Sequence, residues 1–288
     1  MQIGVVFPQT EIGNDTGVIR DYAQTSEDLG YSHILVYDHV LGASLRNRPD
    51  WTGPYNQKHQ FREPLVLFGF IAAITNRIGL TTGVLILPQR QTALVAKQSA
   101  ELDLLSNGRL RLGVGIGWNH VEYQGLGENF RNRGRRVEEQ IELLRELWTQ
   151  DTVNFRGTWH EIIDSGINPL PNQRPIPIWI GGGADTVLKR IARLGDGWFP
   201  PTQPDERGQA MIQKLHQYAQ AEERNPNTIG IEGRLNINLE NQDSWGKMIE
   251  DWKSFGATHL SINTMSSGLL TPSDHIEAIR RFSDAINW

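Results

Sequence analysis

The 288-residue sequence contains no cysteine, which excludes disulfide bonds and thiolate chemistry. It has no run of basic residues, and its net charge of -5 argues against nucleic acid as a partner. The longest apolar stretch, PLVLFGFIAAI, is about half of the roughly 20 residues that a membrane-spanning helix requires. The N-terminal segment MQIGVVFPQ lacks the cationic region and cleavage pattern of a secretory signal. We therefore expect a soluble, cytoplasmic protein with no membrane partner.

Short apolar segments alternate with longer amphipathic segments along the chain. The expected strands cover 3–7, 33–37, 78–87, 110–116, 176–181, 196–199, 229–237 and 258–263. The expected helices cover 15–29, 64–75, 92–105, 136–148, 186–194, 205–223, 244–255 and 273–286. Near-continuous apolar strands separated by helices indicate a parallel sheet covered by helices. Eight such units in this length favour an α/β fold of the (β/α)₈ TIM barrel type over an open, doubly wound sheet, which stays the alternative.

One interruption of this alternation is visible. The segment VNFRGTWHEI predicts a small hairpin inserted after the fourth helix, with its turn at Arg156 and Gly157. The sequence contains no low-complexity tract and no linker. We therefore expect one domain that covers residues 1–288.

The strand ILVY is followed directly by Asp38 and His39, two titratable side chains at a strand end. In TIM barrels the active site lies at the carboxyl ends of the strands. Because an imidazole can bind or release a proton near neutral pH, His39 is the leading candidate for a catalytic acid or base. The alternative is a histidine that only hydrogen bonds a carbonyl group in a loop. The other histidines show no ligand spacing with carboxylates, so we predict no metal site.

The segment GGGADT at 181–186 predicts a phosphate site. Its glycines leave main-chain N–H groups accessible at the start of a helix, where the helix dipole also favours an anion. The alternative is a tight turn in which Asp185 caps the helix. The segment GVGIG at 113–117 lacks the G-x-G-x-x-G spacing of a dinucleotide site, and we expect no helix directly after it.

A long charged and aromatic loop is expected between the second strand and its helix, at 41–64. Loops of this length are usually lids or binding loops, although a solvated surface excursion is the alternative. Its basic residues could meet an anionic ligand, and Trp51 and Tyr55 could cover an apolar one. The basic residues are Arg46, Arg48, Lys58 and Arg62.

Taken together, five segments resemble the bacterial luciferase-like superfamily, and most closely its short, coenzyme F420-dependent oxidoreductase branch. The resemblance runs from residue 1 to about residue 200. The segments are LGYSHILVYDHV, EPLVLFGFIAAITNRIGLTTGVLILPQR, LVAKQSAELDLLSNGRLRLGVGIGWNHVEYQGLG, RGRRVEEQIELLRELW and PIPIWIGGGADTVLKRIARLGDGWFPP.

The resemblance implies a barrel that binds FMN or the deazaflavin F420 across its strand ends. It implies that Asp38 and His39 lie at the cofactor ring, with His39 exchanging a proton next to the reacting carbon. It further implies a non-prolyl cis peptide between Gly83 and Val84 that supports the ring. Two sets of main-chain contacts complete the implied site. Gly117 and Trp118 would flank the ring, and Gly181, Gly182, Gly183, Ala184, Asp185 and Thr186 would hold the cofactor phosphate.

We therefore expect an oxidoreductase that transfers a hydride between F420 or FMN and a small organic substrate, with His39 and Asp38 as catalytic residues. The basic residues of the 41–64 loop could receive the oligoglutamate tail of F420, which favours that cofactor. The alternatives are an FMN-dependent two-component monooxygenase fed by a separate reductase, a flavin-binding relative without turnover, and a barrel that binds a phosphorylated substrate. Sugar-phosphate dehydrogenases of the F420 branch have a catalytic Glu where this chain has Trp118, so we do not predict that substrate, and a second acid or base is unassigned. Members of the family often form homodimers, and we expect one here.

Overall fold

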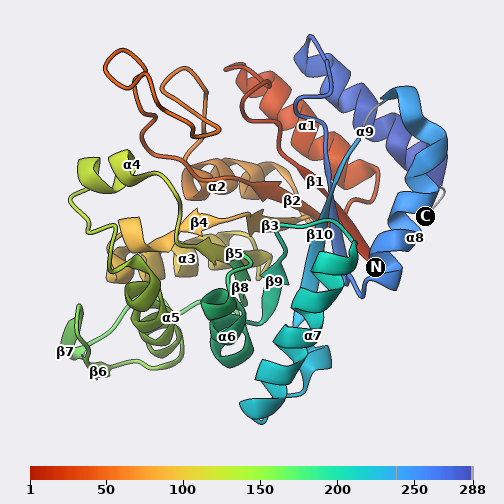
Figure 1. Cartoon of the computed structure of the whole chain (residues 1–288). Helices are drawn as coiled ribbons and strands as arrows, with labels where there is room; N and C mark the ends of the chain where they lie inside the picture. The colour runs from red at the N-terminus through yellow and green to blue at the C-terminus, as the bar shows by residue number, and fades with distance from the viewer. Residues whose placement is uncertain (238, 287–288) are drawn as a thin grey trace.

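The computed structural model describes residues 1–237 and 239–286, and nine of its strands form one parallel sheet (Figure 1). The strands are β1 (Gln2–Val6), β2 (His33–Val36), β3 (Gly79–Thr82), β4 (Leu85–Ile86), β5 (Leu110–Gly115), β8 (Ile178–Gly181), β9 (Gly197–Phe199), β10 (Gly230–Asn236) and β11 (His259–Asn263). Their order is β3-β2-β1-β11-β10-β9-β8-β5-β4, and β3 also pairs with β5. This last pairing closes the sheet into a barrel, in which β3 and β4 are two segments of the third strand. The predicted (β/α)₈ barrel is confirmed, and the open sheet is excluded.

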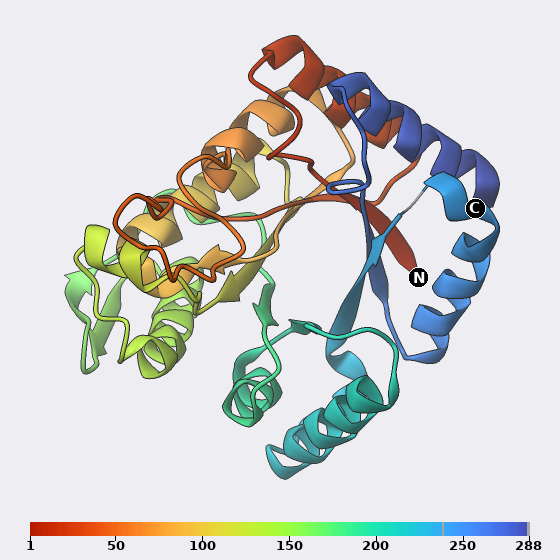
Figure 2. The ribbon, with the colours of Figure 1, turned by 45° about the horizontal axis from the view of Figure 1, so that its top comes forward.

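Helices surround this barrel on its outer side (Figure 2). They are α1 (Thr16–Asp28), α2 (Pro64–Ile74), α3 (Thr92–Leu105), α5 (Arg133–Thr149), α6 (Asp185–Leu194), α7 (Glu206–Ala221), α8 (Trp245–Ser254) and α9 (Pro272–Ile286). Each agrees with a predicted helix to within three residues at either end. Short 3₁₀ turns occur at η1 (Leu87–Gln89), η2 (Pro226–Thr228) and η3 (Leu239–Ser244). Within the residues described, no helix has both the length and the apolarity needed to cross a bilayer.

Local sequence explains where several of these helices begin. The side chain of Asp15 accepts a hydrogen bond from the N–H of Gly17 at the start of α1. Glu63 caps α2 in the same way by accepting from Val66, and Pro64 occupies the first turn, where its missing N–H costs nothing. These caps fix the helix starts after the loops that carry the site.

Two elements interrupt the regular alternation. The predicted hairpin is present as β6 (Val153–Arg156) and β7 (Glu161–Ser165), although its turn lies at 157–160. The helix α4 (His120–Gly125) is a correction, because we expected none directly after GVGIG. Asn119 starts it by accepting hydrogen bonds from the N–H groups of Val121 and Glu122. A helix of six residues is too short to show a helical period in the sequence.

The apolar core lies mainly between the strands and the helices. A smaller apolar cluster of Val6, Leu35 and Met265 lies apart from it. Glu232 of β10 is buried beside three partners. It accepts from His33 Nε2 at 2.9 Å and from Ser261 Oγ at 2.5 Å, and it pairs with Arg111 at 2.5 Å.

Burial would raise the pKa of Glu232, but Arg111 and His33 outweigh it and hold this pKa well below its ordinary value. The carboxylate is therefore ionised and paired inside the barrel.

Candidate active site

The third strand is interrupted by a cis peptide bond between Gly83 and Val84, at the position that the resemblance implied. The side chain of Val84 lies against two glycines of neighbouring strands. A Cβ atom built on Gly115 would lie 2.5 Å from Val84 Cγ2, and one built on Gly181 would lie 3.0 Å from Val84 Cγ1. A side chain at position 115 would therefore displace Val84, and one at position 181 would press tightly against it.

A cavity of about 480 Å³ opens above this interruption. Its wall comes from the carboxyl ends of β2, β4, β5, β8 and β10 and from the loop after β2. Eight of the predicted site residues line it: Asp38, His39, Gly83, Val84, Gly117, Trp118, Gly181 and Gly182. A space of about 390 Å³ shares part of this wall and reaches Glu232 and Ser261 within the barrel. The remaining predicted residues, Gly183, Ala184, Asp185 and Thr186, do not line either space and lie at the start of α6.

His39 is held on one side by a carboxylate that the sequence did not reveal. Its Nδ1 lies 3.4 Å from Oε2 of Glu122, whose side chain is 1% exposed. The other oxygen, Oε1, accepts hydrogen bonds from the main-chain N–H groups of Val40 and Leu41. Among the residues described, Nε2 of His39 has no hydrogen-bond partner, and His39 lines the cavity. The carboxylate thus fixes the imidazole and leaves its other nitrogen accessible.

Hydrogen bonding also decides the charge of Glu122. Burial would raise its pKa, but hydrogen bonds from His39 and from the N–H groups of Leu41 and Val40 lower it below the ordinary value. In the sequence, the pair Asn119 and Glu122 has the spacing of a helix capping box. That spacing was the available signal, but it does not indicate that Glu122 instead reaches a loop some 80 residues earlier.

Asp38 is buried and anchored by two hydrogen bonds. One oxygen accepts from Arg90 Nη2 at 2.8 Å, and the other accepts from the N–H of Ile86 at 2.9 Å. Arg90 also pairs with Glu63 at 2.8 Å. Burial raises the pKa of Asp38, and Arg90 opposes this rise. These contacts make Asp38 a link between β2, the interrupted strand and the start of α2.

The start of α6 has the features of an anion site. The first N–H groups of a helix have no partner within it, and no hydrogen bond of the described residues uses those of residues 183–186. Asp185 is not the cap, as the alternative required: Ala184 occupies that position. The Asp185 carboxylate instead accepts from Tyr218 Oη at 2.7 Å and pairs with Lys189 at 3.3 Å. Its negative charge is therefore partly neutralised by a neighbouring cation.

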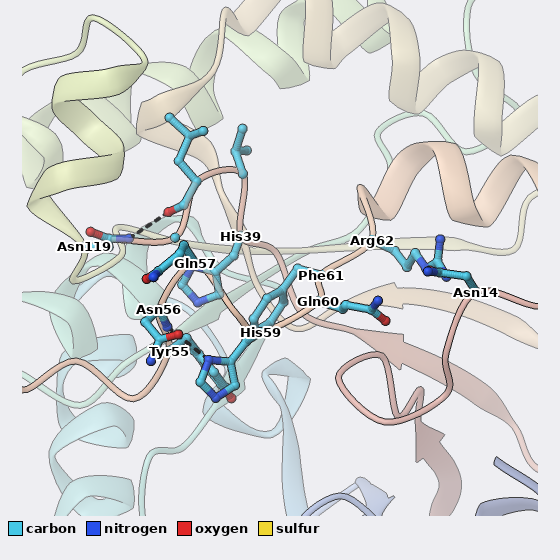
Figure 3. A pocket seen from close by; sticks show the side chains of 13 residues that line it. Asn14, His39, Tyr55, Asn56, Gln57, His59, Gln60, Phe61, Arg62 and Asn119 are labelled. Carbon is cyan, nitrogen blue, oxygen red and sulfur yellow. Dashed lines mark hydrogen bonds between the residues drawn. The ribbon is translucent and has the colours of Figure 1, made fainter. Parts of the chain in front are cut away.

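The loop at 41–64 packs over the mouth with aromatic side chains. His39 lies 4.6 Å from the ring centre of Phe61 and 5.2 Å from that of Tyr55, and all three gather at one end of a further pocket of about 420 Å³ (Figure 3). The ring centres of Trp51 and Trp118 lie 5.7 Å apart, and Trp118 is 38% exposed. The loop thus contributes Pro54 and Tyr55 to the wall of the cavity that contains His39.

Of the four basic residues in that loop, Arg62 alone lines one of the described pockets. It lies with Asn14 at the opposite end of the pocket in Figure 3, and its Nη2 donates to Gly13 O at 2.6 Å and to Asn14 Oδ1 at 2.7 Å. Arg46, Arg48 and Lys58 line none of them.

Comparisons with known proteins agree with this geometry. Residues 1–266 match the family model described as luciferase-like monooxygenase. The chain is 35% identical over 184 residues to an F420-dependent glucose-6-phosphate dehydrogenase of Amycolatopsis mediterranei. This match covers 62% of this chain and 51% of that enzyme. It is 31% identical over 201 residues to an FMNH2-dependent dimethylsulfone monooxygenase of Pseudomonas fluorescens. This match covers 68% of this chain and 51% of that enzyme. The chain thus spans about half the length of both enzymes.

A solved structure of an F420-dependent secondary alcohol dehydrogenase with an F420-acetone adduct has the same fold. The TM-score is 0.80 at 18% identity, and the match covers 99% of this chain and 98% of that one.

Proposed function

Because the chain belongs to the luciferase-like monooxygenase family, we propose that it is an F420- or FMN-dependent oxidoreductase that transfers a hydride between the cofactor and a small organic substrate. The observation that carries this proposal is the shared cavity. It brings His39, Trp118, the cis peptide at Gly83 and the first glycines of the 181–186 segment to one wall.

The residues present fit a phosphate-bearing planar cofactor. Free N–H groups at residues 183–186 would receive the phosphate at the helix start. Glycines 181 and 182 leave the wall between this helix and the cavity without side chains. Trp118 and the interrupted strand would lie along the ring, and the bound cofactor would supply the hydride chemistry.

In this proposal His39 handles the proton that accompanies hydride transfer. With Nδ1–H directed at the Glu122 carboxylate, Nε2 is left as the acceptor on the cavity side. When a hydride leaves a substrate carbon, Nε2 accepts the proton lost from the substrate oxygen, and it returns this proton in the reverse reaction. Asp38, bonded to Arg90 and Ile86, holds the wall of the cavity in place.

Two observations bear on the choice of cofactor. The 35% identity to an F420-dependent enzyme slightly exceeds the 31% identity to an FMNH2-dependent one. Arg62 lines the outer pocket, where an anionic tail could reach it. We therefore favour F420, and an FMN-dependent monooxygenase served by a separate reductase is the second candidate.

The test is a fluorescence titration of the purified protein with F420, FMN and riboflavin. We expect F420 or FMN to bind with micromolar affinity, and riboflavin, which lacks the phosphate, to bind at least about tenfold more weakly. Consumption of oxygen with reduced FMN and a separate reductase would favour the monooxygenase. Failure of both F420 and FMN to bind would refute the proposal.

We also propose that the protein forms a homodimer. Support comes from Val66 and Leu105, which are 72% and 63% exposed on α2 and α3, beside a groove of about 410 Å³. Analytical ultracentrifugation tests this, and a monomer at micromolar concentration would contradict it.

A further inference from the structure

The strand β10 carries a polar residue at every second position: Glu232, Arg234 and Asn236. Successive side chains of a strand point to opposite faces, so these three share one face. Glu232 is buried with its partners inside the barrel, whereas Arg234 and Asn236 are exposed towards its carboxyl end. The same face of β10 therefore changes from a paired charge inside the barrel to an accessible cation at the mouth.

Arg234 differs from the other titratable side chains of the mouth and the barrel interior. Asp38 at the mouth pairs with Arg90, Glu232 inside the barrel pairs with Arg111, and the imidazole of His39 faces the carboxylate of Glu122. For Arg234, no carboxylate of residues 1–237 and 239–286 lies within 4.0 Å. Its Nη1 donates to Tyr37 Oη at 3.0 Å, which orients the guanidinium group, and Nε and Nη2 have no hydrogen-bond partner in the described part of the chain. This wall thus presents a fixed positive charge with free donors.

A separate chamber of about 430 Å³ lies beside this cation. Arg234, Tyr37 and Tyr55 belong both to it and to the cavity that contains His39. Neither the interrupted strand nor residues 181 and 182 line it. The chamber is therefore adjacent to the proposed cofactor cavity, and these three residues belong to the walls of both.

The polar groups of the chamber are oriented by their own hydrogen bonds. Asn263 Oδ1 accepts from the N–H of Met265 at 3.1 Å, so its Nδ2 is directed at Asn236 Oδ1, at 2.9 Å. This arrangement leaves Nδ2 of Asn236 as a donor without a partner among the described residues. Two residues that are neighbours on one strand face thus offer donors to the same chamber, and a guanidinium group can hold a carboxylate through two parallel hydrogen bonds.

We propose that Arg234, assisted by Asn236, binds a carboxylate or sulfonate group of the substrate, so that the protein acts on a small organic acid. The anionic end of this substrate lies in the chamber beside Arg234, and its reacting carbon lies towards His39. That the bound anion is a substrate rests on the proposed function, whereas the anion site itself rests on Arg234, Asn236 and the chamber.

The experiment measures binding of benzoate and benzenesulfonate to the full-length protein through its tryptophan fluorescence, with neutral benzamide as the matched probe. Wild type is compared with Arg234→Gln and Arg234→Lys. Arg156→Gln on the hairpin, with an 80% exposed side chain, is the control. We expect one of the anions to bind at least about tenfold more tightly than benzamide, and Arg234→Gln to lose this preference. Arg234→Lys should recover part of it, because lysine keeps the charge but not the paired donors.

The same samples are titrated with F420 and FMN, which separates the two proposals. If neither cofactor binds while Arg234 still governs anion binding, the proposed function fails and the anion site stands. If a cofactor binds but neither benzoate nor benzenesulfonate does, the anion site is refuted. It is also refuted if the two anions bind to Arg234→Gln as tightly as to wild type. A loss of cofactor affinity in Arg234→Gln as large as the loss of anion affinity would also refute it, because Arg234 would then belong to the cofactor. Circular dichroism of each variant checks that the barrel is folded.

Discussion

Replacing Glu122 with glutamine should exchange the donor and acceptor roles of the two ring nitrogens of His39. In the native protein, Oε1 of Glu122 accepts from the N–H groups of Val40 and Leu41, whereas Oε2 faces His39 Nδ1 at 3.4 Å. In Glu122→Gln the two main-chain donors fix the carbonyl oxygen at the Oε1 position. The amide NH₂ must then replace Oε2 and donate to Nδ1. His39 Nδ1 becomes an acceptor, and its proton moves to Nε2, on the cavity side.

The energetic cost can be worked out from the same contacts. A hydrogen bond to a charged acceptor contributes about 1 kcal/mol more than one to a neutral acceptor, so the two main-chain donors together lose about 2 kcal/mol. Gln89, which donates to Oε2 at 3.2 Å, adds little to this cost, because its own Oε1 is buried without a partner and a flip of the amide supplies an acceptor. We therefore expect the free energy of unfolding to fall by about 2 kcal/mol near neutral pH.

The difference should depend on pH in a defined direction. The pKa of Glu122 is lower in the folded protein than its ordinary value of 4.5. Its charge therefore stabilises the protein fully above about pH 4.5, and this contribution is lost as the pH falls through the folded-state pKa. The gap between wild type and Glu122→Gln should be constant near neutral pH and should narrow in acid.

Two measurements check this reasoning. Nitrogen-15 NMR of the imidazole reports which nitrogen of His39 carries the proton when the ring is neutral, and urea unfolding at several pH values gives the stability difference. Glu142→Gln, on the exposed side of α5, is the control and should change neither quantity. An unchanged tautomer in Glu122→Gln, or a stability difference that persists undiminished in acid, would refute the assigned contacts.

Three further predictions follow from the site and the barrel interior. His39→Ala should lower turnover by about 10²–10⁴-fold with cofactor affinity nearly retained, and near-normal turnover would remove His39 from the proton transfer. Glu232→Gln should lower the free energy of unfolding, measured in urea titrations, by about 3–5 kcal/mol, because it leaves the buried guanidinium of Arg111 without a countercharge. Replacing both Glu232 and Arg111 with methionine should lower it much less. An equal loss of stability in the single and the double variant would contradict the pairing. Gly182→Ala should weaken the binding of FMN, measured by calorimetry, but not that of riboflavin. The φ angle at Gly182 is +124°, so an alanine there would displace the start of α6. Equal weakening of both ligands would count against a phosphate site.

Much of the fold was accessible from the sequence. Eight alternations of apolar strand and amphipathic helix predicted the barrel, because both periods are local and can be recognised without knowing the neighbours of a segment. The position of His39 after an apolar strand and the glycines at 181–183 are also visible in the sequence, and their roles in the site stay predictions. The short helix α4 was missed because six residues do not complete two helical turns. Asp185 was a reasonable cap from its type, but Ala184 is the N-cap of α6, and the Asp185 carboxylate accepts from Tyr218 instead.

The partners of the site residues were not accessible in this way. The alternation of Glu232, Arg234 and Asn236 is visible in the sequence. It does not show which face of the strand points into the barrel, or that Arg234 has no carboxylate partner within residues 1–237 and 239–286. Glu122 meets His39 only because barrel closure brings α4 beside the loop that follows β2. Local periodicity determined which segments are strands and helices, since that depends on residues a few positions apart. Tertiary structure alone decided which charges are paired and which stay available, since a hydrogen bond between residues far apart in the chain depends on the position of both elements in space.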